Sequence, residues 1–212
     1  MGGDSSRDAM TEPREPGEER LRYQAKEVLR GRMRSLRRVL SKDACDERSR
    51  ALSERALELP ELSAAKIVVG FAAFGKEPRL EHVFRTLEAR GVITGLPRVD
   101  EENLTLHLYR AGEPLEESGY GITEPLASAP RIAEPDIDVI LVPGLCFDGS
   151  GYRVGYGKGF YDRLLPKLPR AIRIGICYDH ELLGELPSTS HDVPVHIVVT
   201  NARVLKVEAS KT

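Results

Sequence analysis

The chain has 212 residues, enough for one domain with a sizeable buried core. Hydrophobic residues make up 41% of it and charged residues 30%, as in an ordinary globular protein. The net charge of -2 does not favour a nucleic acid or an anionic membrane as partner, and no apolar run approaches the roughly 18 residues that cross a bilayer. The three cysteines, at positions 45, 146 and 177, are widely spaced and form no Cys-x-x-Cys pair. They indicate reduced thiols and a cytoplasmic protein.

The N-terminal part predicts a tail followed by helices. Residues 1–18 are polar and predict a disordered tail, and residues 19–212 are expected to form a single domain. Ser41 and Asp43 predict the start of a second helix that Pro60 ends. Before it, apolar residues recur at three- and four-residue steps and predict an amphipathic helix whose apolar stripe faces the core. The stripe consists of Leu21, Ala25, Val28, Leu29, Met33, Leu36, Val39 and Leu40.

Strands and helices alternate in the rest of the chain. We expect a sheet with helices on both faces, that is, one α/β domain with three α/β/α layers, a mostly parallel central sheet and an N-terminal helical segment. Ligands bind such sheets at the carboxyl ends of strands, and the loop after Val142 lies at such an end. The expected helices are 81–90 and 159–165, and the expected strands are 66–74, 92–96 (ended by Pro97), 104–109, 138–142, 171–177 and 195–200.

The segment 142–165 carries the clearest chemical pattern. Glycines surround Arg153 and Lys158 and lead into the last expected helix. Glycine lets backbone N–H groups approach a ligand, and a helix N-terminus with two cations would complete a polyphosphate cradle. The spacing is neither that of a Walker A loop nor that of the dinucleotide fingerprint, which would need glycine where Phe160 stands. On glycine density alone, a flexible loop with two solvated cations remains an equal alternative.

The amino-acid sequence of this segment resembles that of a known family. VPGLCFD at 142–148 and RVGYGKGFYD at 153–162 resemble the signature of the 5-formyltetrahydrofolate cyclo-ligases. Further motifs resemble the family in the same order, so that the resemblance covers roughly residues 22–201. These motifs are KEVLR at 26–30, LPR at 96–98, GITEP at 121–125 and His191-Asp192.

The resemblance implies an ATP- and Mg²⁺-dependent enzyme that converts 5-formyltetrahydrofolate to 5,10-methenyltetrahydrofolate. In that reaction the formyl oxygen is phosphorylated, N10 closes the ring, and ADP and phosphate are released. The resemblance makes Arg153 and Lys158 the catalytic candidates, as cations that stabilise the transferring phosphoryl group. The residues that it implies for ATP are Lys26, Glu27, Val28, Leu29, Arg30, Arg153, Val154, Gly155, Tyr156, Gly157, Lys158, Gly159, Phe160 and Tyr161.

The resemblance also implies a metal site and a folate site. Asp162 and Asp192 are expected to bind Mg²⁺, although Asp162 would also suit the first turn of a helix and Asp192 an ordinary turn. The reduced folate, with or without a polyglutamate tail, is the expected partner. Its expected contacts are Ala72, Glu77, Tyr120, Tyr156, Gly157, Lys158, Gly159 and Phe160.

Two departures from the family pattern keep other functions open. Glu77 is followed by Pro-Arg-Leu, where the family commonly has an apolar residue, an acid and threonine, and His196 stands where a further acid is usual. A non-catalytic homologue that binds folate or a nucleotide is therefore the main alternative. The basic residues between Arg20 and Arg38 leave nucleic-acid binding as a weaker one, because the net charge is negative and no aromatic ladder accompanies them. The sequence does not indicate the oligomeric state.

Overall fold

The computed structural model describes residues 16–119 and 121–208. Residues 1–15, which make up most of the expected tail, lie outside the described residues. The first helix begins at Pro16, so the expected boundary at residue 18 falls inside its first turn.

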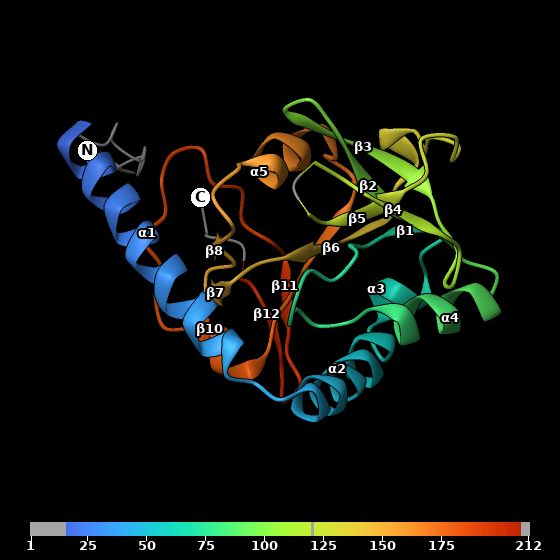
Figure 1. Ribbon diagram of the computed structural model, residues 1–212, viewed down its shortest axis with the longest axis horizontal. Helices are drawn as coiled ribbons and strands as arrows, with labels where there is room; N and C mark the ends of the chain where they lie inside the picture. Colours follow the sequence, from blue (N-terminus) through green and yellow to red (C-terminus); the bar gives the residue numbers. More distant parts are fainter. Residues whose placement is uncertain (1–15, 120, 209–212) are drawn as a thin grey trace, which may run out of the picture.

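Two long helices open the described chain, and strands then alternate with shorter helices (Figure 1). The α-helices are α1 (Pro16–Arg38), α2 (Lys42–Leu57), α3 (Pro60–Ser63), α4 (Glu81–Ala89) and α5 (Phe160–Leu164). The 3-10 helices are η1 (Glu134–Asp136), η2 (Leu165–Lys167) and η3 (Asp179–Glu181). The strands are β1 (Ile67–Val69), β2 (Ile93–Asp100), β3 (Asn103–Leu108), β4 (Leu115–Glu117), β5 (Thr123–Pro125), β6 (Val139–Pro143), β7 (Cys146–Asp148), β8 (Arg153–Val154), β9 (Ile172–Ile176), β10 (Leu182–Leu183), β11 (Ile197–Val199) and β12 (Val204–Lys206).

The central sheet is mostly parallel, as expected. Its strands follow the order β12-β11-β9-β6-β1-β2-β3. The inner strands run parallel to one another, and β3 and β12 add antiparallel edges. The short apolar run predicted as a central parallel strand is β6, which pairs with β1 on one side and β9 on the other.

Alternate side chains of the sheet enter two separate cores. On β6, Val139 and Leu141 pack in the core that α2, α3 and α4 cover. Ile140 and Val142 point the other way and pack in the core that contains Leu164 of α5. Figure 1 shows α2, α3 and α4 on one side of the sheet and α5 on the other. The three-layer α/β/α arrangement is therefore confirmed.

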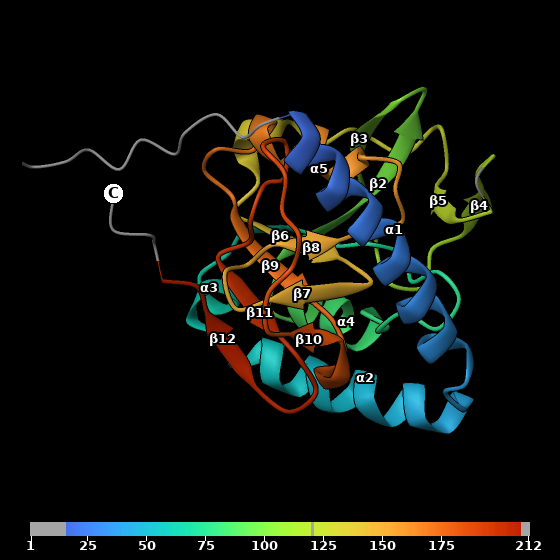
Figure 2. The ribbon, with the colours of Figure 1, turned by 90° about the vertical axis from the view of Figure 1, so that its left-hand side faces the viewer.

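Helix α1 lies outside these layers and runs beside the small sheet formed by β10, β7 and β8 (Figure 2). The expected core-facing stripe is wrong except at Met33, because Leu21, Val28 and Leu36 of α1 are 66%, 73% and 40% exposed. The buried residues of α1 are Lys26, Arg30, Met33 and Arg37. Polar side chains thus occupy most of the inner face of this helix, which points to a binding site beneath it.

Two expected strand ends differ from the structure. β1 covers only Ile67–Val69 of the expected strand 66–74, and the chain after it turns away to line a cavity. β2 continues through Pro97 to Asp100, although Pro97 was expected to end it. Since β1 pairs with β2 only as far as Gly95, the missing N–H of Pro97 lies where β2 has a single neighbour, β3. The short strands β4, β5, β7, β8, β10 and β12 were not predicted.

Candidate functional site

A cavity of about 860 Å³ opens at the carboxyl ends of the parallel strands. Pro143, the last residue of β6, lines it together with Phe71 and Ala72, which follow β1. The inner face of α1, the glycine-rich loop (residues 155–159), parts of β2 and β3, residues 122–123 and the segment 189–192 also line it. The cavity therefore lies where a mostly parallel sheet is expected to bind its ligand.

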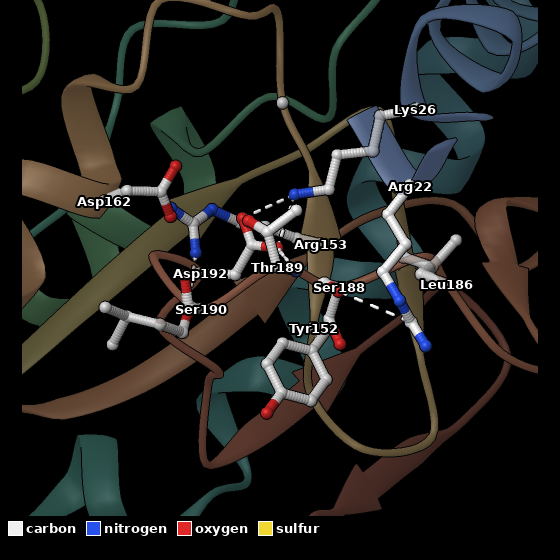
Figure 3. Close-up of polar contacts among 12 residues, drawn as sticks. Arg22, Lys26, Tyr152, Arg153, Asp162, Leu186, Ser188, Thr189, Ser190 and Asp192 are labelled. Carbon is white, nitrogen blue, oxygen red and sulfur yellow. Dashed lines mark hydrogen bonds and ion pairs between the residues drawn. The ribbon is translucent and has the colours of Figure 1, made fainter. Parts of the chain in front are cut away.

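An ion pair between α1 and the segment 189–192 forms part of the wall (Figure 3). Lys26 Nζ donates to both carboxylate oxygens of Asp192, at 2.6 Å to Oδ1, and the two side chains are 7% and 11% exposed. Thr189 donates to Asp192 Oδ2 from its backbone N at 2.6 Å and from its hydroxyl at 3.2 Å. Asp192 is thereby fixed, and it holds the Lys26 ammonium at the cavity wall.

A second ion pair joins β8 to α5. Arg153 Nη2 donates to Asp162 Oδ1 at 2.7 Å, and Nη1 donates to the carbonyl oxygen of Val193 at 2.8 Å. Its guanidinium lies 6.0 Å from the centroid of the Tyr161 ring. Arg153 is buried and Asp162 is partly exposed, and both line the cavity. Arg153 is thus a cation whose position is fixed before any ligand binds.

Helix α1 also holds the glycine-rich loop. Arg30 Nε donates to the carbonyl oxygen of Gly155 at 2.9 Å, and Arg34 Nη2 donates to that of Tyr156 at 3.1 Å. The Arg34 guanidinium lies 5.5 Å from the centroid of the Tyr156 ring. The spacing of Arg30 and Arg34 on one helical face therefore sets the position of the loop.

Two glycines of this loop adopt conformations that L side chains rarely adopt. Gly157 has a φ of 99°, and Gly159 has a φ of 67°. A Cβ atom on Gly159 would also lie 2.8 Å from Arg163 Nη1. Lys158 lies between the two glycines and lines the cavity. The glycine pattern is thus required by the backbone that presents Lys158.

A buried carboxylate marks another part of the cavity. Glu77 is 4% exposed, and its Oε2 accepts from the backbone N of Phe74 at 3.0 Å. Arg37 Nη1 donates to Glu77 Oε1 at 3.3 Å and to the Tyr156 hydroxyl at 3.1 Å. Burial raises the pKa of the Glu77 carboxyl, and the positive charge of Arg37 opposes this rise. The edge-to-face contact of Phe74 with Tyr156, at 5.9 Å between centroids, brings aromatic surface beside the carboxylate.

Arg37 was missed as a site residue, because only Lys26 and Arg30 among the basic residues of α1 were assigned to the site. It is 5% exposed and donates to Glu181 through Nε at 2.6 Å and through Nη2 at 2.9 Å. Nη2 also donates to the carbonyl oxygen of Gly144 at 2.5 Å. Burial by itself would lower the pKa of Arg37, but Glu181 holds it above its usual value. The signal in the sequence was the helical spacing, which places Arg37 on the face of Lys26 and Arg30.

Comparison with known proteins decides the family. The sequence profile of the 5-formyltetrahydrofolate cyclo-ligase family matches residues 22–201. This chain belongs to that family. A 5-formyltetrahydrofolate cyclo-ligase of Mycolicibacterium smegmatis is 36% identical over 66% of this chain and 76% of its own length. That of Escherichia coli (strain K12) is 28% identical over 81% of this chain and 98% of its own.

A solved structure agrees with the family. The 5,10-methenyltetrahydrofolate synthetase of Aquifex aeolicus has a TM-score of 0.77 and is 29% identical, over 88% of this chain and 95% of its own. Membership of the cyclo-ligase family confirms the expectation of a ligase in folate metabolism.

Most of the residues that the cyclo-ligase signature implied meet in the one cavity. Those that line it are Lys26, Arg30, Ala72, Glu77, Arg153, Gly155, Tyr156, Gly157, Lys158, Gly159, Phe160, Tyr161, Asp162 and Asp192. Four others do not line it. Val28 is exposed, Glu27 pairs with Arg30, and Leu29 and Val154 pack in a small core beside α1. The helical period explains the first three, since contiguous residues of a helix cannot share one face. Tyr120 lies outside the described residues.

The two departures from the cyclo-ligase pattern lie away from the cavity wall. Arg79 Nη1 donates to Asp46 Oδ1 of α2 at 2.5 Å, so this extra cation contacts a helix and not the cavity. His196 accepts from the backbone N of Arg173 at 3.0 Å through Nδ1. Burial, followed by the charge of Arg173, lowers the pKa of His196. Neither replacement changes the set of charges that faces the ligand space.

The described residues contain no helix that is both long and apolar enough to span a membrane. Cys45, Cys146 and Cys177 are all buried as free thiols, in line with the expectation of reduced cysteines.

Proposed function

We propose that the chain uses Mg-ATP to convert 5-formyltetrahydrofolate to 5,10-methenyltetrahydrofolate, releasing ADP and phosphate, and that it does so in the cytoplasm. The observation that carries the proposal is the pairing of two chemistries in one cavity. Lys26, Arg30, Arg153 and Lys158 suit a polyphosphate, and Glu77 beside aromatic rings suits a flat ligand with N–H donors.

The reaction needs alignment and charge more than a covalent catalyst. The formyl oxygen, made nucleophilic by the N5 lone pair, attacks the γ-phosphorus of ATP, and the bond from phosphorus to ADP breaks. N10 then adds to the formyl carbon and loses its proton, and inorganic phosphate leaves. Arg153 and Lys158 stabilise the charge on the transferring phosphoryl group, and Lys26 and Arg30 hold the phosphates behind it.

The protein would orient the folate through its pterin ring. The pterin ring carries an amino group and ring N–H groups. The buried Glu77 carboxylate accepts from Arg37 and from the backbone N of Phe74, and its remaining lone pairs can accept from the pterin. Tyr156 and Phe74 supply aromatic surface next to it. We place the folate between this carboxylate and the glycine-rich loop.

For Mg²⁺ we keep Asp162 and Asp192 as the candidate ligands. The described residues contain no group of three or more His, Cys, Asp or Glu side chains that could hold a metal by themselves. Two carboxylates at the cavity wall nevertheless fit an ion that keeps phosphate oxygens and waters in its shell. When bound, the ion would neutralise phosphate charge. Asp162 and Asp192 would each exchange an ion-pair contact with Arg153 or Lys26 for it.

Release of ADP separates this proposal from a protein that only binds folate or nucleotide. Purified protein would be incubated with ATP and Mg²⁺, with and without 5-formyltetrahydrofolate, and ADP and phosphate would be quantified. We expect one ADP and one phosphate for each folate consumed and almost none without folate. Tight binding of both ligands without ADP release would overturn the catalytic proposal and support the binding protein.

A further inference from the structure

Arg37 uses every hydrogen-bond donor that a guanidinium has. Three of its bonds go to fixed partners, the two oxygens of Glu181 and the carbonyl oxygen of Gly144. The remaining two go to Glu77 and to the hydroxyl of Tyr156, which both line the cavity. An arginine carries five N–H donors, so none of them is left for another group.

The fixed partners orient the side chain. Glu181 is 1% exposed and accepts through both oxygens, so the guanidinium plane is set by a two-point contact. With that plane fixed, Nη1 points toward the cavity and defines where the Glu77 carboxylate and the Tyr156 hydroxyl can lie. Glu77 and Tyr156 come from separate loops, one after β1 and one after β8. Arg37 of α1 is therefore the residue that fixes the position of Glu77 relative to Tyr156.

We propose that Arg37 is the positioning residue of the folate site, which it serves by holding Glu77 and Tyr156 where the pterin ring binds. This inference rests on the proposed function. Arg37 acts through these two residues and does not itself contact the substrate. Lysine could not take its place, because an ammonium has three donors around one point and cannot grip Glu181 while it reaches both cavity residues.

The charges around Glu77 predict how pH should act. The groups that face it are Arg37 from α1, Tyr156 from the glycine-rich loop, Tyr161 from α5, and Glu181 from η3. Burial raises the pKa of Glu77, and Arg37 is the cation that opposes this rise. Without Arg37 the pKa of Glu77 would rise further, so less of the carboxylate would be ionised at a given pH. Folate binding in such a variant should therefore recover as the pH is raised.

The test compares Arg37→Lys, Glu77→Gln and the double variant with the wild-type protein. We expect Arg37→Lys to raise the KM for folate by about 10- to 100-fold, the range for losing a hydrogen bond to a charged group, and the KM for ATP by less than about 3-fold. In the Glu77→Gln background, the same change should raise the KM for folate by less than about 3-fold, because the two residues act as one unit. Arg38→Lys, an exposed neighbour on α1, is the matched control and should leave both values unchanged.

A purely structural role would give a different pattern. Arg37→Lys would then lower the melting temperature while leaving the KM for folate unchanged, or the effects of Arg37→Lys and Glu77→Gln would multiply. Either result overturns the inference. If Arg37→Lys does not fold, Arg37→Gln is measured by folate binding from about pH 6 to pH 9, where affinity should rise with pH more steeply than in the wild type. If the folate affinity of Arg37→Gln changes with pH in parallel with that of the wild type, the inference is overturned as well. A wild-type protein that binds no reduced folate would instead refute the proposed function.

Discussion

The cations and carboxylates of the cavity are already paired with one another. Lys26 contacts Asp192, and Arg153 contacts Asp162. We propose that each cation binds phosphate and that each carboxylate binds Mg²⁺. The ion pairs would therefore hold the site in order before Mg-ATP arrives, and a polyphosphate and a dication together would replace both partners of each pair.

Substitution of Lys158 tests the part of the cavity that is proposed to bind the transferring phosphoryl group. We predict that Lys158→Ala lowers the rate of methenyltetrahydrofolate formation by about 100-fold or more, because it removes a cation from the transferring group. The melting temperature should change little, since Lys158 lies on the exposed surface of the loop. Lys167→Ala, an exposed lysine on η2, is the control and should retain full turnover. Near wild-type turnover in Lys158→Ala would remove Lys158 from the mechanism.

Asp162 and Asp192 test the metal assignment. We predict that Asp162→Asn and Asp192→Asn each raise the Mg²⁺ concentration needed for half-maximal activity, because an amide binds a hard dication less well than a carboxylate. Folate binding without ATP should be nearly unchanged. Activity is titrated against Mg²⁺ for both variants, with thermal melts alongside. An unchanged Mg²⁺ curve with only a lower melting temperature would show that these carboxylates merely hold Arg153 and Lys26.

Many of the residues that line the cavity were anticipated, because the family resemblance names them one by one. The glycine pattern indicated a polyphosphate cradle or a plain flexible loop around Arg153 and Lys158, and only the family resemblance made them catalytic candidates; both line the cavity. Arg37 could not be assigned in this way, because its role depends on Glu181, Glu77 and Gly144, which are far from it in the sequence.

Helix α1 shows how a hydrophobic pattern can mislead. Its apolar residues predict a buried stripe, yet Leu21 and Val28 are exposed and the inner face carries Lys26 and Arg37. The prediction of a buried face from the spacing of apolar residues assumes that burial follows hydrophobicity. Over a ligand cavity this assumption fails, because polar side chains are buried there by fixed hydrogen-bond partners.

Two substitutions on α1 separate its inner and outer faces. Met33 is 3% exposed and packs with Leu145 and Val154, so Met33→Ala should destabilise the protein by about 2–5 kcal/mol. Val28 lies on the outer face, and Val28→Ala should change stability by about 0.5 kcal/mol or less. Chemical denaturation of both variants measures the difference. Equal destabilisation by the two changes would contradict the orientation of α1.

At the scale of the whole molecule, the sheet was predictable and the assembly of the cavity was not. The alternation of apolar runs and helices indicated three layers, and the apolar run at 138–142 indicated the strand that became β6. The cavity, however, is lined by α1, the loop after β1, β2 and β3, the loop after β8 and the segment 189–192. Figure 3 shows one of these junctions, the contact of Lys26 on α1 with Asp192. No periodicity in the sequence indicates which loops meet. Only the order of the family motifs suggested that these segments share a site.

The central claim is that the residues of this cavity catalyse the ATP-dependent ring closure of 5-formyltetrahydrofolate. The most direct measurement is the absorbance band of 5,10-methenyltetrahydrofolate in a mixture of purified protein, ATP, Mg²⁺ and 5-formyltetrahydrofolate. We predict that the band grows with time only when ATP and Mg²⁺ are both present. It should grow about 100-fold or more slowly with Lys158→Ala. A band that never appears, although the folded wild-type protein binds both ATP and the folate, would contradict the account.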